Sequence, residues 1–252
     1  MMTKEGLMVS SCTGEVLFGE RPQNYTDLSA NISEANGGFL LTAYDGGGEI
    51  SPTAEILCCG GKYLWDQGIR ECPVTVRTPK DGGEYRLLCS TCAERVTGVT
   101  ASMGKADFIP KNIPLRFEKS IINDQIVLPE QKPFRMTALR FHVPYAVIFV
   151  DTAGDCLILN RGGQIGKMNL FPQGAEVLFV YARGEKELHI RACHRDGSTA
   201  VRGNDVCAAL AAAVATGRCL PDTAVTAPLD KGTARAVCTK EWELFLTLPM
   251  FS

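Results

Sequence analysis

Long apolar runs, an excess of basic residues and paired metal-binding cysteine motifs are all missing from this chain of 252 residues. No stretch approaches the roughly 18 apolar residues of a membrane-spanning helix, so we expect no membrane partner. The formal net charge of −2 creates no basic field, and we expect no nucleic-acid partner. The first residues lack an apolar segment behind a basic one, which argues against a secretory signal and favours a cytoplasmic location.

Cysteine is abundant, because the chain contains 11 of these residues. In a cytosolic chain such residues are reduced thiols, and several lie in apolar runs where a thiol behaves as a small hydrophobic group. Cys89 and Cys92 form a CxxC motif, but no second pair at suitable spacing completes a zinc site. A redox pair also favours the start of a helix, whereas this motif lies between predicted strands. We therefore expect no metal and no cofactor.

Most of the chain alternates between apolar and polar residues, as half-buried strands do. Clusters of glycine, proline and aspartate separate these segments and indicate turns. The glycine-rich stretches 46–48 and 161–164 lack the strand–loop–helix context, with a lysine, of a phosphate loop. The predicted strands are 37–43, 74–78, 85–89, 94–101, 135–142, 145–150, 175–182, 187–193 and 242–248.

Two segments break this alternation, and each predicts a helix. The sequence Ser-Pro-Thr-Ala-Glu at 51–55 combines a cap residue, a first-turn proline and an early acid, and it opens a helix that runs to about Gly68. A second helix begins at 203–205 and ends near Gly217. Both are apolar or small nearly all round, so we expect both to be buried.

The two predicted helices have the same surroundings. Each follows a strand and an Asp-Gly turn, ends at a glycine and leads into a β segment, with an offset of about 150 residues between the copies. This repeat predicts an α/β (α+β) fold with two pseudo-symmetric lobes, each a curled, mainly antiparallel, barrel-like sheet around a central helix. The N-terminal lobe should span 1–125 and be completed by the last strand, 242–252, and the C-terminal lobe should span 126–241.

Three local motifs carry a family resemblance: Val143–Asp151, Phe171–Val177 and the stretch 193–208. They are similar to the Asn-Pro-His strand, the Phe-Pro-Glu-Gly-x-Asn-Val segment and the second cysteine motif of the diaminopimelate epimerase-like superfamily. That superfamily includes proline racemase and the isomerase of phenazine biosynthesis, and the resemblance covers about residues 10 to 250. It implies a PLP-independent isomerase with an active-site cleft between the lobes, where helix N-termini hold the carboxylate of a small amino or carboxylic acid. Relatives often dimerise, which leaves a homodimer open.

The same resemblance implies a changed active site. The two catalytic cysteines of the family fall on Thr53 and Arg202, and neither can act as a thiolate, because a threonine hydroxyl is too weak an acid and arginine stays protonated. Two substrate-contacting asparagines become Glu15 and Glu176. We therefore predict Thr53, Arg202, Glu15 and Glu176 as catalytic residues. The predicted substrate-binding residues are Ala54, Glu55, Gly203, Asn204, His194 and Arg195.

Each role has a structural alternative. Thr53 either hydrogen-bonds a substrate or caps its own helix. Arg202 either clamps a carboxylate or neutralises a neighbouring glutamate, Glu15 or Glu176. First-turn acids are either acid/base groups or partners of the helix dipole, and His194 either shuttles protons or is structural.

The first hypothesis for function is a cofactor-independent isomerase that acts on a small amino or carboxylic acid by proton transfer, without the two-cysteine mechanism. A single carboxylate base supports double-bond isomerisation or dehydration better than racemisation, because inversion of a stereocentre ordinarily needs two groups on opposite faces. The alternative is a non-catalytic ligand-binding protein derived from an epimerase. A thiol redox or metal-binding protein is the further alternative.

Overall fold

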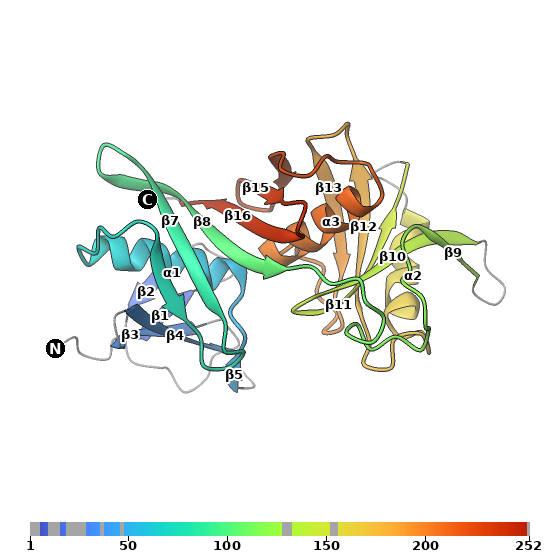
Figure 1. Cartoon of the computed structure of the whole chain (residues 1–252), viewed down its shortest axis with the longest axis horizontal. Helices are drawn as coiled ribbons and strands as arrows, with labels where there is room; N and C mark the ends of the chain where they lie inside the picture. Colours follow the sequence, from blue (N-terminus) through green and yellow to red (C-terminus); the bar gives the residue numbers. More distant parts are fainter. Residues whose placement is uncertain are drawn as a thin grey trace. The chain divides into compact units, whose positions relative to one another are not determined.

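The computed structural model describes residues 6–9, 16–18, 29–35, 38–45, 48–127, 133–151 and 156–250. It divides into two compact units (Figure 1): unit 1 comprises Met1–Met103 with Leu246–Ser252, and unit 2 comprises Gly104–Phe245. The fold is α+β, as the sequence predicts, and strands dominate it. In chain order the elements are β1 (Gly6–Val9), β2 (Val16–Phe18), β3 (Ser29–Ala35), β4 (Gly38–Asp45), β5 (Gly48–Ile50), α1 (Ala54–Asp66), β6 (Val74–Arg77), β7 (Glu84–Cys92), β8 (Arg95–Lys105), β9 (Asp124–Ile126), β10 (Phe134–Phe141), β11 (Val143–Phe149), α2 (Cys156–Gly166), β12 (Glu176–Ala182), β13 (Leu188–Cys193), α3 (Gly203–Ala215), β14 (Val225–Pro228), β15 (Thr233–Cys238) and β16 (Glu243–Pro249).

Unit 1 is a sheet packed on α1. Its strands follow the order β16-β8-β7-β6-β4-β3-β1-β2, with β5 beside β4, and β16 belongs to this unit from Leu246 onward. β4 and β6 are parallel and are joined through α1, whereas β6 and β7 are antiparallel. The helix contacts β1, β3 and β7, and the Cys58 thiol donates a hydrogen bond to the Val99 carbonyl of β8 (3.3 Å). Four strands, β1, β3, β7 and β8, therefore meet one helix.

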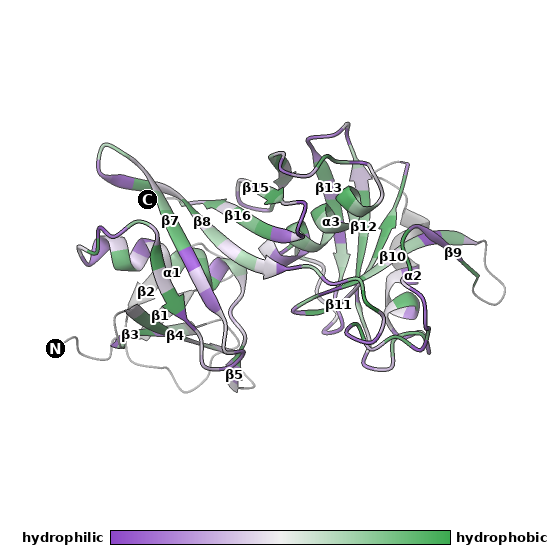
Figure 2. Cartoon of the chain, in the orientation of Figure 1, coloured by the Kyte–Doolittle hydropathy of each residue, from purple (hydrophilic) through white to green (hydrophobic). Residues whose placement is uncertain are grey.

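Unit 2 contains a five-stranded sheet in the order β13-β12-β11-β10-β9. β11 and β12 are parallel and are connected through α2, and the other neighbours are antiparallel. The helix α3 contacts β10, β11, β12, β13 and β15. Nearly all of α3 is buried, as its composition predicts, and Figure 2 shows it as a largely hydrophobic element.

The two central helices, α1 and α3, begin and end alike. Each has 13 residues, and the N-cap residues, Thr53 and Arg202, both have extended backbones. Each helix ends at a glycine with a positive φ, +88° at Gly68 and +70° at Gly217. These features match the predicted repeat. Within the described ranges both sheets are open paths of strands, so each lobe is a sheet packed on a helix rather than a closed barrel.

The described residues contain a third helix, α2, where the sequence predicts only two. Its two adjacent glycines are poor helix formers and weaken the helical signal. Gly162 has a packing reason, because a Cβ there would lie 2.6 Å from the Cβ of Cys193 on β13. The glycine therefore permits the close approach of α2 to the sheet.

The predicted strands are present as β4, β6, β7, β8, β10, β11, β12, β13 and β16, whereas short strands such as β1, β5 and β9 are not among the predictions. The segment 104–125 belongs to unit 2, although the predicted lobe boundary follows it. Asp107 exchanges two backbone hydrogen bonds with Arg140 (2.9 and 2.7 Å), and Ile113 and Ile121 lie in the core of unit 2. None of the described helices could span a membrane.

The glycine pair in α1 yields a prediction about stability. A Cβ at Gly61 would lie 2.9 Å from Cγ1 of Val99 and 3.4 Å from Cβ of Leu87. We expect Gly61→Ala to lower the free energy of unfolding by about 1–2 kcal/mol, because overpacking a buried contact outweighs the better helix propensity of alanine. Chemical denaturation measures the change.

Gly163→Ala in α2 is the control, because its Cβ would meet nothing within 4 Å. That control should be neutral or stabilising by up to about 1 kcal/mol, and an equal effect of both changes would contradict the packing argument.

Candidate active site

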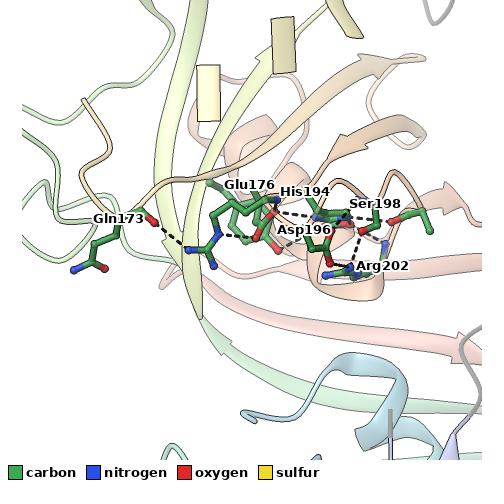
Figure 3. A network of polar contacts seen from close by, with 10 residues as sticks. Gln173, Glu176, His194, Asp196, Ser198 and Arg202 are labelled. Carbon is green, nitrogen blue, oxygen red and sulfur yellow. Dashed lines mark hydrogen bonds and ion pairs between the residues drawn. The ribbon is translucent and has the colours of Figure 1, made fainter. Parts of the chain in front are cut away.

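A network of charged side chains lies at the N-terminus of α3 in unit 2 (Figure 3). Three elements supply it: Glu176 begins β12, His194 follows the last residue of β13, and Asp205 lies in the first turn of α3. All three residues are buried. Three carboxyl groups and three cationic side chains meet here, so the network is balanced in charge. Its members are Glu176, Asp196, Asp205, His194, Arg195 and Arg202.

His194 lies between two carboxylates. Its side chain is 1% exposed, with Nδ1 3.1 Å from Oε2 of Glu176 and Nε2 3.3 Å from Oδ2 of Asp205. Nε2 is also 3.1 Å from the carbonyl oxygen of Ala200. Burial lowers the pKa of His194, but the hydrogen bonds to Asp205 and Glu176 dominate and raise it to about 10. The ring is therefore protonated at neutral pH, and both of its nitrogens donate.

Glu176 is held by two cations. Besides His194, the backbone N–H of Arg195 donates to Oε2 (2.9 Å) and Nε of Arg195 donates to Oε1 (3.0 Å). Nη1 of Arg195 also donates to the carbonyl oxygen of Gln173 (3.0 Å). Burial opposes ionisation, but the hydrogen bonds from His194 and Arg195 lower the pKa of Glu176 below its ordinary value. Glu176 is thus an ionised carboxylate in a fixed orientation.

Asp205 joins the network to the helix. Its side chain is fully buried, and Oδ2 accepts a hydrogen bond from the backbone N–H of Arg202 (2.8 Å), as the third helical residue does in a capping box. Oδ1 accepts from the hydroxyl of Tyr145 on β11 (3.1 Å). Burial and the charge of Asp205 raise the pKa of Tyr145 well above 10, so the phenol remains a neutral donor.

Arg202 extends from the N-cap of α3 toward solvent. Nη2 donates to Oδ2 of Asp196 (2.9 Å) and to Oγ of Ser198 (2.8 Å), and the side chain is 42% exposed. Hydrogen bonds from Ser198 and Arg202 lower the pKa of Asp196. The ion pair of Arg202 is with Asp196, whereas the carboxylate of Glu176 is bound by Arg195 and His194.

The N-terminus of α1, in unit 1, is simpler. Thr53 is the N-cap, and its Oγ1 accepts a hydrogen bond from the backbone N–H of Ile56 (3.4 Å), which is the capping role foreseen as its alternative. Glu55 is the acid of the first turn and is half-buried, and Ala54 is buried. The remaining predicted catalytic residue, Glu15, lies outside the described residues.

The structure thus brings four of the predicted residues into one network, namely Glu176, His194, Arg195 and Arg202. Gly203 and Asn204 form the first turn of the same helix. Sequence reasoning missed Asp196, Ser198 and Tyr145 as members. Asp196 and Ser198 flank the glycine of a predicted turn, and that turn could have pointed to them. Tyr145 lies in an almost wholly apolar strand, where no feature of the sequence distinguishes it.

The ion pairs of this network are formed by side chains other than the described thiols. Cys207 is buried within α3, and burial together with the charge of Glu55 raises the pKa of Cys59 to about 11. In the part of the chain that the structure describes, no group of three or more His, Cys, Asp or Glu side chains is arranged to hold a metal ion.

The raised pKa of His194 predicts how stability depends on pH. A folded-state pKa above the ordinary value of 6.5 stabilises the fold fully below pH 6.5, and this contribution disappears as the pH rises through about 10. We expect His194→Gln to lower the free energy of unfolding at pH 7 by about 3 kcal/mol, because it leaves two buried carboxylates without their shared cation. Denaturation at several pH values should show this difference shrinking toward pH 10.

His189→Gln is the control, since that side chain is 35% exposed and pairs with Glu187 at the surface. A difference for His194→Gln that does not change with pH would overturn the assignment of a buried imidazolium.

Several known proteins are similar in sequence to this chain. No protein-family model matches the chain. A diaminopimelate epimerase of Leptospira biflexa is 28% identical over 224 residues, which are 86% of this chain and 79% of that protein. A diaminopimelate epimerase of Bacillus licheniformis is 30% identical over 180 residues, which are 70% of this chain and 62% of that protein. In several of these relatives the matched region covers less than two thirds of the length of the protein.

Solved structures show the same fold. A probable proline racemase of Agrobacterium radiobacter superposes with a TM-score of 0.62 at 13% identity, covering 88% of this chain and 74% of that one. A phenazine biosynthesis protein of Enterococcus faecalis gives a TM-score of 0.60 at 10% identity, covering 97% and 95%. A methylitaconate-delta-isomerase gives 0.59 at 10% identity, covering 88% and 79%. Together, the sequence relatives and the shared fold support an isomerase-type enzyme of the diaminopimelate epimerase-like superfamily of epimerases, racemases and isomerases.

Proposed function

We propose that the protein is a cofactor-independent isomerase that moves a proton within a small amino or carboxylic acid, without the two-cysteine mechanism of diaminopimelate epimerase. The observation that carries the proposal is the network at the N-terminus of α3, where an oriented, ionised Glu176 acts electrostatically on the partly exposed guanidinium of Arg202. The two helix N-caps, Thr53 and Arg202, offer a hydroxyl and a cation in place of thiols.

In this proposal Arg202 binds the carboxylate of the substrate. Within the described chain its guanidinium contacts only Asp196 and Ser198, both through Nη2, so Nε and Nη1 still carry N–H donors. A guanidinium fork binds a carboxylate through two parallel hydrogen bonds. The first turn of α3, at Gly203 and Asn204, adds the positive end of the helix dipole, which favours an anion at the same place.

Glu176 is the proposed base. Its charge is close enough to act on Arg202, because Asp196, Asp205 and Glu176 together raise the pKa of that guanidinium against the opposing effect of burial. A carboxylate of lowered pKa is a weak base, so the substrate proton must be acidified by a neighbouring carboxylate or carbonyl that Arg202 neutralises. One base of this kind suits double-bond isomerisation or dehydration better than inversion of a stereocentre. Thr53 and Glu15 remain proposed contributors.

A second function is favoured by one specific observation, namely that the buried carboxylates are already paired. Glu176 is bound by His194 and Arg195, and Asp205 by His194, Tyr145 and the Arg202 backbone. Groups satisfied in this way need no ligand to complete them. The alternative is therefore a non-catalytic protein in which Arg202 binds a small anion without turnover.

Hydrogen exchange in D₂O separates the two functions. The protein is incubated with a panel of amino, hydroxy and unsaturated acids, and NMR follows deuterium at the carbons next to carboxylates and double bonds. We expect incorporation with at least one acid. Glu176→Gln should slow the exchange by about 100-fold or more, which is the usual contribution of a general base. Glu185→Gln, in an exposed loop, is the matched control and should leave the rate unchanged.

The KM tests the proposed role of Arg202 in substrate binding. Arg202→Ala should raise the KM by about 10- to 100-fold, as expected for loss of a charge-assisted hydrogen-bonded pair. Arg191→Ala, an exposed arginine on β13, is its control. If no acid exchanges deuterium but one raises the melting temperature of the wild type and not of Arg202→Ala, the binding protein replaces the isomerase.

A further inference from the structure

A tyrosine of β11 lies beside the proposed base. β11 and β12 are parallel neighbours in the sheet of unit 2, and Tyr145 is the register partner of Glu176. Because side chains alternate between the two faces of a sheet, register partners on adjacent strands point to the same face. Both residues are buried, with exposed fractions of 3% and 8%. The phenol of Tyr145 therefore belongs to the immediate surroundings of Glu176.

Tyr145 is connected to Glu176 a second time, through two other side chains. Its hydroxyl donates to Oδ1 of Asp205 (3.1 Å), and Oδ2 of Asp205 lies 3.3 Å from Nε2 of His194. Nδ1 of His194 is in turn 3.1 Å from Oε2 of Glu176, and Figure 3 shows this last contact. The four side chains form a closed ring, in which three contacts are polar and the fourth is the strand pairing of Tyr145 with Glu176.

The contacts of Glu176 indicate which of its oxygens can accept a proton. Oε2 accepts from His194 and from the backbone N–H of Arg195 (2.9 Å), and each carboxylate oxygen offers about two lone-pair positions. Oε1 accepts from Nε of Arg195 (3.0 Å), which leaves one position among its contacts with the described residues. The base of the proposed function therefore acts through Oε1, and its orientation depends on how firmly Oε2 is held.

Tyr145 affects that hold through Asp205. The carboxylate of Asp205 is fully buried, so it depends on its hydrogen-bond donors for stabilisation. Without the phenol, Asp205 would attract the His194 proton on Nε2 more strongly, and the bond from Nδ1 to Glu176 would weaken. Hydrogen bonds in a chain are coupled in this way because each bond polarises the next. The phenol itself keeps its proton, since burial and Asp205 raise the pKa of Tyr145 well above 10.

We propose that Tyr145 is a positioning residue for proton transfer, which acts through Asp205 and His194 to orient Oε1 of Glu176. This inference rests on the proposed function, in which Glu176 is the base. The substrate proton moves to Oε1, while the protons of Tyr145 and His194 stay on their own atoms. The other titratable groups that contact or act on Glu176 are left in place when Tyr145 is changed: Arg195, Arg202 and Cys193.

NMR of the imidazole N–H groups tests this chain without a substrate. Protein labelled with ¹⁵N-histidine should show two N–H protons of His194, and His194→Gln identifies them by their loss. Tyr145→Phe should move the Nε2 proton downfield and the Nδ1 proton upfield, because the bond to Asp205 strengthens while that to Glu176 weakens. Incorporation of 3-fluorotyrosine at position 145 supplies a stronger donor and should move both protons the other way. Unchanged His194 signals in these folded variants would overturn the proposal.

Tyr85→Phe is the matched control. Tyr85 is buried in unit 1, and its hydroxyl donates to Oδ2 of Asp81 (2.7 Å), so this variant also loses a hydrogen bond between a tyrosine and an aspartate. It should leave the His194 signals and the exchange kinetics as they are in the wild type.

Kinetics with an acid that exchanges deuterium test the effect on the reaction. Tyr145→Phe should lower kcat about 10-fold and leave the KM within about twofold, because a misplaced base slows the chemical step while Arg202 still binds. The acid limb of the kcat–pH profile should move to higher pH, since Glu176 loses part of its stabilisation. A change confined to the KM, or a rate no lower than that of Tyr85→Phe, contradicts the positioning role. If no acid exchanges deuterium, the proposed function fails, whereas the His194 signals still decide whether Tyr145 acts on Glu176.

Discussion

The buried imidazolium of His194 holds the candidate site together. An isolated charge inside a protein is strongly unfavourable, and a buried cation is tolerated only where anions and hydrogen bonds compensate it. Here Glu176 of β12 and Asp205 of α3 flank the ring at 3.1 and 3.3 Å. The same contact neutralises two carboxylates that would otherwise repel each other. It thereby joins the start of β12 and the end of β13 to the start of α3.

Asp205 explains how an arginine can occupy an N-cap. The side chain of a cap residue ordinarily accepts a hydrogen bond from the helix, and a guanidinium has no acceptor. In α3 the third helical residue compensates, because the Asp205 carboxylate accepts from the backbone N–H of Arg202. The guanidinium is then released from capping and extends to Asp196 and solvent. In α1 the corresponding third residue is Ile56, and Thr53 caps the helix with its own hydroxyl. The repeat thus keeps the same helix ends, and among the described residues the buried charged side chains lie at the N-terminus of α3.

Local signals predict much of this architecture, and long-range contacts account for what they miss. Alternation of apolar and polar residues predicts most strands, and the cap residues and terminal glycines predict α1 and α3. These signals depend only on residues that are close in sequence. The α2 helix is hidden because Gly162 serves a contact with Cys193 on another element. The family resemblance selects Glu176 and Arg202, yet it does not predict their partners. Which acid an arginine reaches depends on the path of the loop between β13 and α3, and the bond from Tyr145 to Asp205 joins residues far apart in sequence.

The balance of charge also constrains the chemistry. His194 is protonated and Glu176 is ionised at neutral pH, so neither group has a pKa near 7. Acid–base catalysts work best when their pKa is close to the working pH. A substrate carboxylate at Arg202 would add one negative charge and draw that guanidinium away from sole pairing with Asp196. Proton transfer from the substrate to Glu176 would move one negative charge from the Glu176 carboxylate to the substrate, where Arg202 would stabilise it. The bound anion would also raise the affinity of Glu176 for a proton, because like charges repel each other. A site of this design suits a substrate whose own carboxylate acidifies the migrating proton, and it disfavours a symmetric exchange between two equal bases.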